Sequence, residues 1–174
     1  MGYYVNTIDV KVFIDSNHFR ALYDALCELN QHDEWKGGGS YGGEFDQSKP
    51  RPEGYDYHPG RWYSWMAADY PHKLFNAIDV LKAVGFDITT NEYGDIVGMS
   101  YDNKTGCEDV FLNACAPFMR SGSYIAFRGE DGEMWRYKFV GGKMYVQGSK
   151  VTWTGTTEFE PFNIGAYRLA LGSR

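Results

Sequence analysis

Apolar and polar residues alternate near the start of the chain with the period of a β-strand. Ile8, Val10, Val12 and Ile14 stand at every second position, which places them on one face of an extended chain. This alternation predicts a strand with one buried face. Apolar residues at helical spacing follow directly and predict an amphipathic helix over residues 17–30.

Two further helices are predicted in the middle of the chain. The first covers residues 71–84, because it opens with a proline that suits a first turn and its apolar stripe stops at Gly85. The second covers residues 107–118, where Thr105 and Glu108 have the spacing of a capping box ahead of an apolar stripe. Both helices have one apolar side with which to pack against a sheet.

Short strand-like runs separated by turn residues predict hairpins in the second half of the chain. One hairpin covers residues 86–101, and a meander of four runs follows within residues 123–153. In the second run of the meander, Trp135, Tyr137 and Phe139 stand at alternate positions. One face of the meander is therefore expected to cover helices, and the other face is expected to meet solvent.

The order of these elements mixes strands and helices without strict alternation. It predicts an α+β fold in which an antiparallel sheet, with a C-terminal β-meander, is covered mainly on one face by about three helices. The chain has 174 residues, of which 43% are hydrophobic, and this size suits a single domain over residues 1–174.

Charge is distributed unevenly along the chain and bears on the choice of partner. The net charge of −6 combines 10 basic and 18 acidic residues in residues 1–120 with 7 basic and 5 acidic residues in residues 121–174. An acidic balance repels a phosphate backbone, so it argues against unspecific nucleic-acid binding and favours a protein partner or simple solubility.

Targeting signals and cysteine spacing bear on the compartment. The N-terminus does not resemble a signal peptide, and no run approaches the roughly 20 apolar residues of a membrane span. The three cysteines lack CxxC spacing and are expected to be free thiols. These features predict a cytoplasmic protein without a membrane segment.

The most unusual stretch is a long connection between the first two helices, at about residues 31–61. Connections beyond about 15 residues without secondary structure are usually functional or disordered. Residues 38–42 match the G-x-S-x-G pattern of a hydrolase nucleophile elbow, but a helix precedes them where the elbow requires a strand. A phosphate-binding loop motif is absent, and we expect no cofactor.

Histidines and acidic residues around this connection leave a small metal-dependent hydrolase open as an alternative. His32, Asp33, Asp56 and His58 are of the residue types that bind zinc or manganese. Their spacing is not that of HExxH, which places two ligands on one helical face. The alternative therefore depends on their convergence in the fold.

Aromatic residues are concentrated in this connection among glycine, serine and proline. Tyr and Trp supply a large contact area at low entropic cost, while Gly and Ser let the backbone adapt, so the composition favours a recognition surface. We expect Trp65 and one of its neighbours to be buried, because indoles are seldom left exposed. The candidate binding residues are Trp35, Tyr41, Phe45, Tyr55, Tyr57, Trp62 and Tyr63, with the acidic residues Glu44, Asp46 and Asp56.

Two other binding surfaces are open from the sequence. A small-molecule or sugar binder would stack its ligand on the same Trp and Tyr side chains. On the predicted solvent face of the meander, Arg128, Arg136, Lys138 and Lys143 are able to form a basic stripe. Alternating charged residues on a strand are most often only its solvated face.

Residues 101–139, YDNKTGCEDVFLNACAPFMRSGSYIAFRGEDGEMWRYKF, resemble a stretch in uncharacterised small proteins of bacteriophages and mobile elements. The resemblance supplies no catalytic residues. It implies a setting in which compact, acidic, aromatic-rich proteins act by binding, as anti-CRISPR inhibitors of host defence systems do. Taken with the lack of a catalytic motif, it leads us to expect a non-enzymatic protein-binding module that docks through residues 36–63 and blocks its partner.

Overall fold

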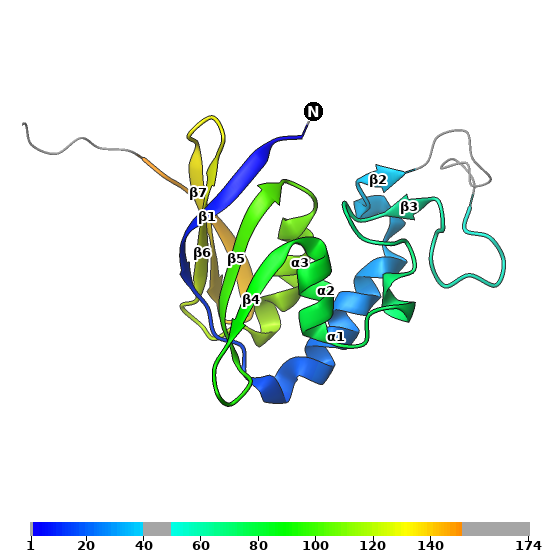
Figure 1. The fold of residues 1–174 in the computed structure, drawn as a ribbon, viewed down its shortest axis with the longest axis horizontal. Coiled ribbons are helices and arrows are strands. Elements are labelled where there is room, and N and C mark those ends of the chain that lie inside the picture. The colour runs from blue at the N-terminus through cyan, green and yellow to red at the C-terminus, as the bar shows by residue number, and fades with distance from the viewer. Residues whose placement is uncertain (1, 40–49, 151–174) are drawn as a thin grey trace, which may run out of the picture.

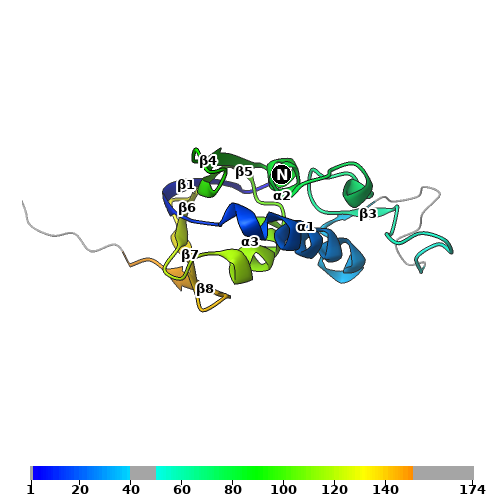
Figure 2. The same cartoon turned by 90° about the horizontal axis from the view of Figure 1, so that it is seen from below.

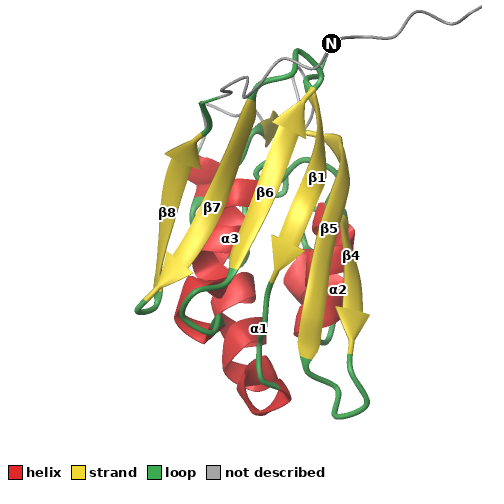
Figure 3. Ribbon diagram, turned by 90° about the vertical axis from the view of Figure 1, so that its left-hand side faces the viewer, coloured by secondary structure: helices red, strands yellow, loops and turns green. Residues whose placement is uncertain are grey.

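A six-stranded antiparallel sheet runs through the protein (Figure 3). In the computed structural model, which describes residues 2–39 and 50–150, the strand order is β4-β5-β1-β6-β7-β8. The N-terminal strand therefore lies between a hairpin and a three-stranded meander. The strands are β1 (Tyr4–Lys11), β4 (Phe86–Thr90), β5 (Ile96–Lys104), β6 (Tyr124–Gly129), β7 (Met134–Val140) and β8 (Lys143–Gly148).

Three α-helices cover one face of this sheet, which confirms the predicted α+β fold (Figure 1). They are α1 (Phe19–Glu28), α2 (Ala77–Val84) and α3 (Glu108–Cys115), and α1 packs against both of the others (Figure 2). A two-stranded ribbon of β2 (Gly38–Gly39) and β3 (Arg61–Trp62) lies beyond the helices (Figure 1). The 3-10 helices are η1 (Ser16–His18), η2 (Leu29–Gln31), η3 (Asp33–Trp35), η4 (Tyr70–His72) and η5 (Ala116–Phe118).

The core lies between the inner face of the sheet and the helices. Leu22 of α1 and Phe111 of α3 belong to the same fully buried cluster as Phe127 and Phe139 of the sheet. Each such side chain contributes roughly 1.5–3 kcal/mol when it leaves water. Alternate residues of β7 face this core, as its sequence predicts, and the intervening residues face outward.

The strand expected at residues 8–14 differs from β1 in its bounds and at one apolar position. Thr7 pairs with Phe127 and Asp9 pairs with Ala126, so Ile8 is an extra residue in the ladder. This β-bulge turns Ile8 outward, where it is 44% exposed, although the alternation predicted burial. Ile14 is buried as expected, but beyond the end of the strand.

The second helix starts later than its proline suggests. Pro71 lies in η4, and α2 begins at Ala77. Asn76 is the N-cap, and its Oδ1 accepts a hydrogen bond of 2.8 Å from the amide of Asp79. The end of the helix is as predicted, because Gly85 adopts the left-handed conformation with φ 117°.

The third helix is present, but its predicted capping box is not. Cys107 is the N-cap residue, and the Glu108 carboxylate reaches back to the amide of Gly106 rather than pairing with Thr105. The hairpin at 86–101 and the first three runs of the meander are confirmed as β4–β5 and β6–β8. Most of the fourth run lies outside the described residues.

Candidate functional site

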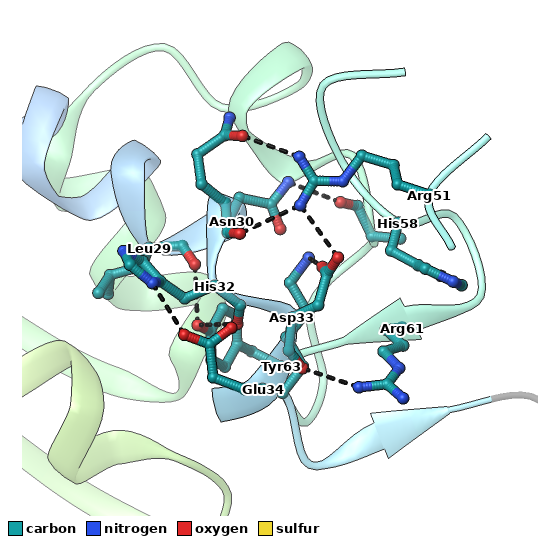
Figure 4. A network of polar contacts seen from close by, with 12 residues as sticks. Leu29, Asn30, His32, Asp33, Glu34, Arg51, His58, Arg61 and Tyr63 are labelled. Carbon is teal, nitrogen blue, oxygen red and sulfur yellow. Dashed lines mark hydrogen bonds and ion pairs between the residues drawn. The ribbon is translucent and has the colours of Figure 1, made fainter. Parts of the chain in front are cut away.

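The connection after α1 is fixed by a network of polar contacts around Asp33 (Figure 4). Asp33 binds the Lys36 ammonium through Oδ1 at 2.7 Å and the Arg51 guanidinium through Oδ2 at 3.0 Å. Arg51 also donates to the side chain of Gln31 at 2.9 Å and to the carbonyl of Asp56 at 2.9 Å. We call this set the Asp33 network. It ties the far end of the connection to the end of α1.

The charges of the Asp33 network stabilise one another. Partial burial acts to raise the pKa of Asp33, but hydrogen bonds from Lys36 and Arg51 outweigh it and leave that pKa below its ordinary value. The Lys36 side chain is itself buried, which lowers its pKa despite the pairing with Asp33. An ion pair screened from water in this way is worth more than an exposed one.

The predicted long loop is therefore not structureless in its described parts. Residues 33–35 form η3, and Gly38 and Gly39 pair with Trp62 and Arg61 in the small ribbon. The Trp62 indole lies against Gly38 closely enough that a side chain at this position would overlap it. Glycine is needed here for the close approach of an aromatic ring to the backbone.

Two tryptophans are exposed beside a tight turn at Gly106 and Cys107. Trp35 is 47% exposed, and its ring stacks on that of His32 with a centroid distance of 3.9 Å. Its backbone carbonyl accepts a hydrogen bond of 3.8 Å from the Cys107 thiol. Trp65 is 53% exposed, and its Nε1 lies next to Gly106. We call Trp35 and Trp65 the tryptophan surface.

The prediction that Trp65 is buried is wrong. Strand β3 ends at Trp62, and Ser64 adopts a positive φ of 34°, which turns the chain so that Trp65 leaves the core. Tyr63, a neighbour of Trp65, is buried, as the second part of that prediction expects. Its hydroxyl donates to the carbonyl of Leu29 at 2.9 Å, and burial raises its pKa. Tyr63 is therefore a core residue.

The other candidate binding residues are distributed over the same region. Tyr55 is exposed and meets Tyr57 edge to face at 5.4 Å. Asp56 pairs with His72 at 2.9 Å, which lowers the Asp56 pKa. Trp62 is half-buried on Gly38. Tyr41, Glu44, Phe45 and Asp46 lie outside the described residues.

The histidines and carboxylates considered for a metal site each interact with a different partner. His32 pairs with Glu34 at 3.1 Å, and Asp33 is engaged by Lys36 and Arg51. The buried His58 accepts a hydrogen bond from the amide of Gly60 at 3.1 Å. Within residues 2–39 and 50–150, no three His, Cys, Asp or Glu side chains form a group able to hold a metal ion.

A cavity of about 640 Å³ opens beside the tryptophan surface, and sequence reasoning missed it. It lies between the start of α3, strand β7, the turn at Ser64 and the glycines at the start of β2. We call it the acidic cavity. Its lining consists of Tyr3, Gly37, Gly38, Ser64, Thr105, Gly106, Cys107, Glu108, Asp109, Glu133, Trp135 and Tyr137.

Glu108 is the buried carboxylate of the acidic cavity and is only 6% exposed. Its Oε2 accepts a hydrogen bond of 2.6 Å from the amide of Gly106. Among the described residues, no Lys, Arg or His lies within ion-pair distance of it. Burial raises the pKa of this carboxyl group, and burial also raises the pKa of the nearby Tyr101 and Tyr137 to about 12.

Two non-glycine residues with positive φ meet at the rim of the acidic cavity. Cys107 has φ 68° and Ser64 has φ 34°, and the Ser64 hydroxyl donates to the carbonyl of Gly106. No other described residue except glycine has a positive φ. Such conformations cost roughly 1–3 kcal/mol each and cluster at functional sites. Among the residues that the structure describes, no histidine lines the cavity next to the Cys107 thiol to act as its base.

The outer face of the sheet carries the predicted basic residues. The register of β6, β7 and β8 places Arg128, Arg136, Lys138 and Lys143 on the face away from the helices. The Arg136 guanidinium lies 5.5 Å from the centroid of the Tyr124 ring and donates to Gln147 at 2.8 Å. This face lies on the opposite side of the sheet from the helices.

Comparison with known proteins leaves this geometry as the main evidence for function. No protein-family model, no curated protein and no solved structure matches the chain. Within the described ranges, no helix combines the length and the apolar character that crossing a membrane requires.

Proposed function

We propose that the protein is a non-enzymatic binding module that docks onto a protein partner through the tryptophan surface. The observation that carries the proposal is the exposure of Trp35 and Trp65, each by about half, beside one ordered turn. Tryptophan is among the residues most enriched at the energetic centres of protein interfaces. An indole left half in water on a scaffold with a well-formed core marks a surface that gains free energy when it is covered.

The Asp33 network supports the proposal because it orders the surface before binding. Trp35 ends η3, and Asp33 at the start of η3 is held by Lys36 and Arg51. Stacking on His32 restricts the Trp35 indole further. A surface that is already ordered loses less conformational entropy on association, so more of the contact free energy appears as affinity.

The setting implied by the resemblance guides the choice of partner. That setting is one in which small acidic proteins often act by binding, for example as inhibitors of host defence systems, and we propose a component of such a system as the partner. The acidic net charge of −6 favours a partner with a basic surface, because complementary charge speeds association and selects against acidic competitors.

Affinity capture with matched variants tests the proposal. The double variant Trp35→Ala, Trp65→Ala is compared with Tyr93→Ala, Tyr145→Ala, which removes two exposed aromatic residues from the β4–β5 turn and from β8. We expect the first variant to lose the partner, with affinity at least 100-fold lower if each indole contributes about 2 kcal/mol. The second variant is expected to bind as the wild type does.

Thermal unfolding checks that both variants fold. All four residues are exposed, so each melting temperature should stay within a few degrees of the wild-type value. For a domain of this size, a change of 1 kcal/mol in stability shifts the melting temperature by about 2–4 °C. Retention of the partner by the tryptophan variant, or its equal loss from both variants, would exclude the tryptophan surface as the docking site.

A further inference from the structure

The acidic cavity contains a buried negative charge that the described chain does not neutralise. Glu108 is only 6% exposed, and among the described residues its carboxylate has backbone amides as hydrogen-bond donors, that of Gly106 at 2.6 Å and its own, and no cationic side chain. A buried carboxylate without a counter-charge destabilises the folded state when it is ionised. A cation that entered the cavity would recover part of this free energy.

The remaining charges in the cavity have the same sign. Asp109 and Glu133 line it with Glu108, and no basic residue of the described ranges is among its lining residues. Three lysines adjoin lining residues in the sequence, and all three lie elsewhere, Lys138 being on the outer face of the sheet. Lys36 pairs with Asp33, and Lys104 places its Nζ 5.4 Å from the centroid of the Tyr4 ring on the outer face of the sheet. The cavity therefore attracts cations from outside the chain.

Aromatic walls define the shape of cation that fits. Tyr3, Trp135 and Tyr137 line the cavity opposite the start of α3. Trp135 stacks on Phe127 with a centroid distance of 5.7 Å and an interplanar angle of 10°, so its ring is held in place. Rings of this kind attract a cation at their faces, and a guanidinium group suits them best because it is planar and weakly hydrated.

We propose that the acidic cavity receives an arginine side chain of the protein partner, with its guanidinium group paired with Glu108 and lying against the aromatic wall. This inference rests on the proposed function, because the cavity shares the Gly106–Cys107 turn with the tryptophan surface. The two indoles supply apolar contact area, and the cavity supplies charge recognition for one specific residue. A volume of about 640 Å³ lies within the range of about 300–1,000 Å³ typical of ligand pockets.

The positive-φ residues give the cavity its form. Cys107 in the left-handed conformation starts α3 abruptly, so that Glu108 reaches back to Gly106 within the cavity wall. Ser64, with its positive φ, reverses the chain on the opposite wall of the cavity. Its hydroxyl donates to the Gly106 carbonyl and so links the two walls. The two strained residues thus lie where the backbone positions the Glu108 carboxylate and forms the rim of the cavity.

Titration of the isolated protein with capped amino acids tests this inference without the partner. The probes are Nα-acetyl-arginine amide, its neutral isostere Nα-acetyl-citrulline amide, and Nα-acetyl-lysine amide, each followed by two-dimensional NMR. We expect the arginine probe to shift the amide signals of Gly106 and Glu108 and the indole signal of Trp135. We expect no binding of the citrulline probe and several-fold weaker binding of the lysine probe.

Two variants make the test specific. Glu108→Gln keeps the shape and an acceptor for the Gly106 amide but removes the charge, so arginine binding should weaken at least tenfold. Glu92→Gln removes an exposed acid from the β4–β5 turn and should leave binding unchanged. Equal binding of arginine and citrulline, no arginine binding, or unchanged binding by Glu108→Gln with a native spectrum would overturn the inference.

The probe experiment and the capture experiment test two different claims, and each claim can be rejected without the other. An arginine probe that does not bind, while the partner is still lost from the tryptophan variant, rejects only the arginine site. A probe that binds through Glu108, while the partner is retained by the tryptophan variant, rejects only the docking surface.

Discussion

At the scale of single residues, the protein shows a conflict between stability and recognition at Glu108. Its carboxylate is buried and lacks a cationic partner among the described residues, whereas Asp33 has two. The pKa shifts express the difference, because that of Glu108 is raised and that of Asp33 is lowered. The negative charge of Asp33 stabilises the fold, and the negative charge of Glu108 opposes it.

The free energy of unfolding is predicted to rise in Glu108→Gln by about 1 kcal/mol at neutral pH, the scale of one uncompensated buried polar group. A carboxyl group with a raised pKa binds its proton more tightly in the folded state. Its stabilising contribution is therefore present below the unfolded pKa and is lost as the pH rises through the folded pKa. The variant should differ little from the wild type in acid and should gain stability toward pH 7.

Urea unfolding between pH 4 and pH 8 measures this difference, with Glu133→Gln as a control on the exposed side of the same cavity. The groups near Glu108 that also carry or gain charge are Asp109, Cys107, Tyr101 and Tyr137. A Glu108→Gln variant that is less stable than the wild type at pH 7 would refute the account of this residue.

At the scale of elements, local capping determines where the helices start. The sequence offers Pro71 as a first helical residue, but Asn76 supplies the side-chain acceptor of the N-cap, and α2 begins at the next residue, Ala77. Asp15 similarly caps η1 by accepting from the amide of Asn17, although the adjacent Ser16 is an equally good N-cap type. Several residues of one segment satisfy the same capping rule, and tertiary packing selects among them.

Asn76→Ala is predicted to lower the free energy of unfolding by about 1 kcal/mol, because the amide of Asp79 loses its acceptor. Asn113→Ala is the matched control, since Asn113 lies exposed within α3 and alanine favours a helix. Chemical unfolding measures both variants. Equal stability of Asn76→Ala and the wild type would show that packing alone fixes the start of α2.

The strands were more predictable than the helix ends, for a physical reason. A period of two over β7 leaves one arrangement that buries Phe139 and exposes Arg136, so pattern and structure agree. In β1, a bulge at Ile8 shifts the pattern by one residue. A bulge depends on the pairing of two distant segments, β1 and β6, and no pattern within residues 4–11 encodes it.

At the scale of the whole molecule, the candidate site is assembled from segments that are far apart in the sequence. The tryptophan surface joins residues 35 and 65 at a turn formed by residues 106 and 107, and the acidic cavity adds residues 3 and 133–137. The aromatic content of the connection predicted a recognition surface near Trp35. The burial of Glu108 was not predictable, because its spacing from Thr105 is that of a capping box and its surroundings come from segments distant in the sequence.

Site-specific photo-crosslinking maps the docking surface most directly. Trp35 and Tyr145 are each replaced by p-benzoylphenylalanine, which keeps an aromatic side chain at two exposed positions that lie on opposite sides of the molecule's sheet. The proposed function predicts that the partner is crosslinked from position 35 and not from position 145. Crosslinking from position 145 alone would show that the outer face of the sheet is the docking surface and would contradict the account.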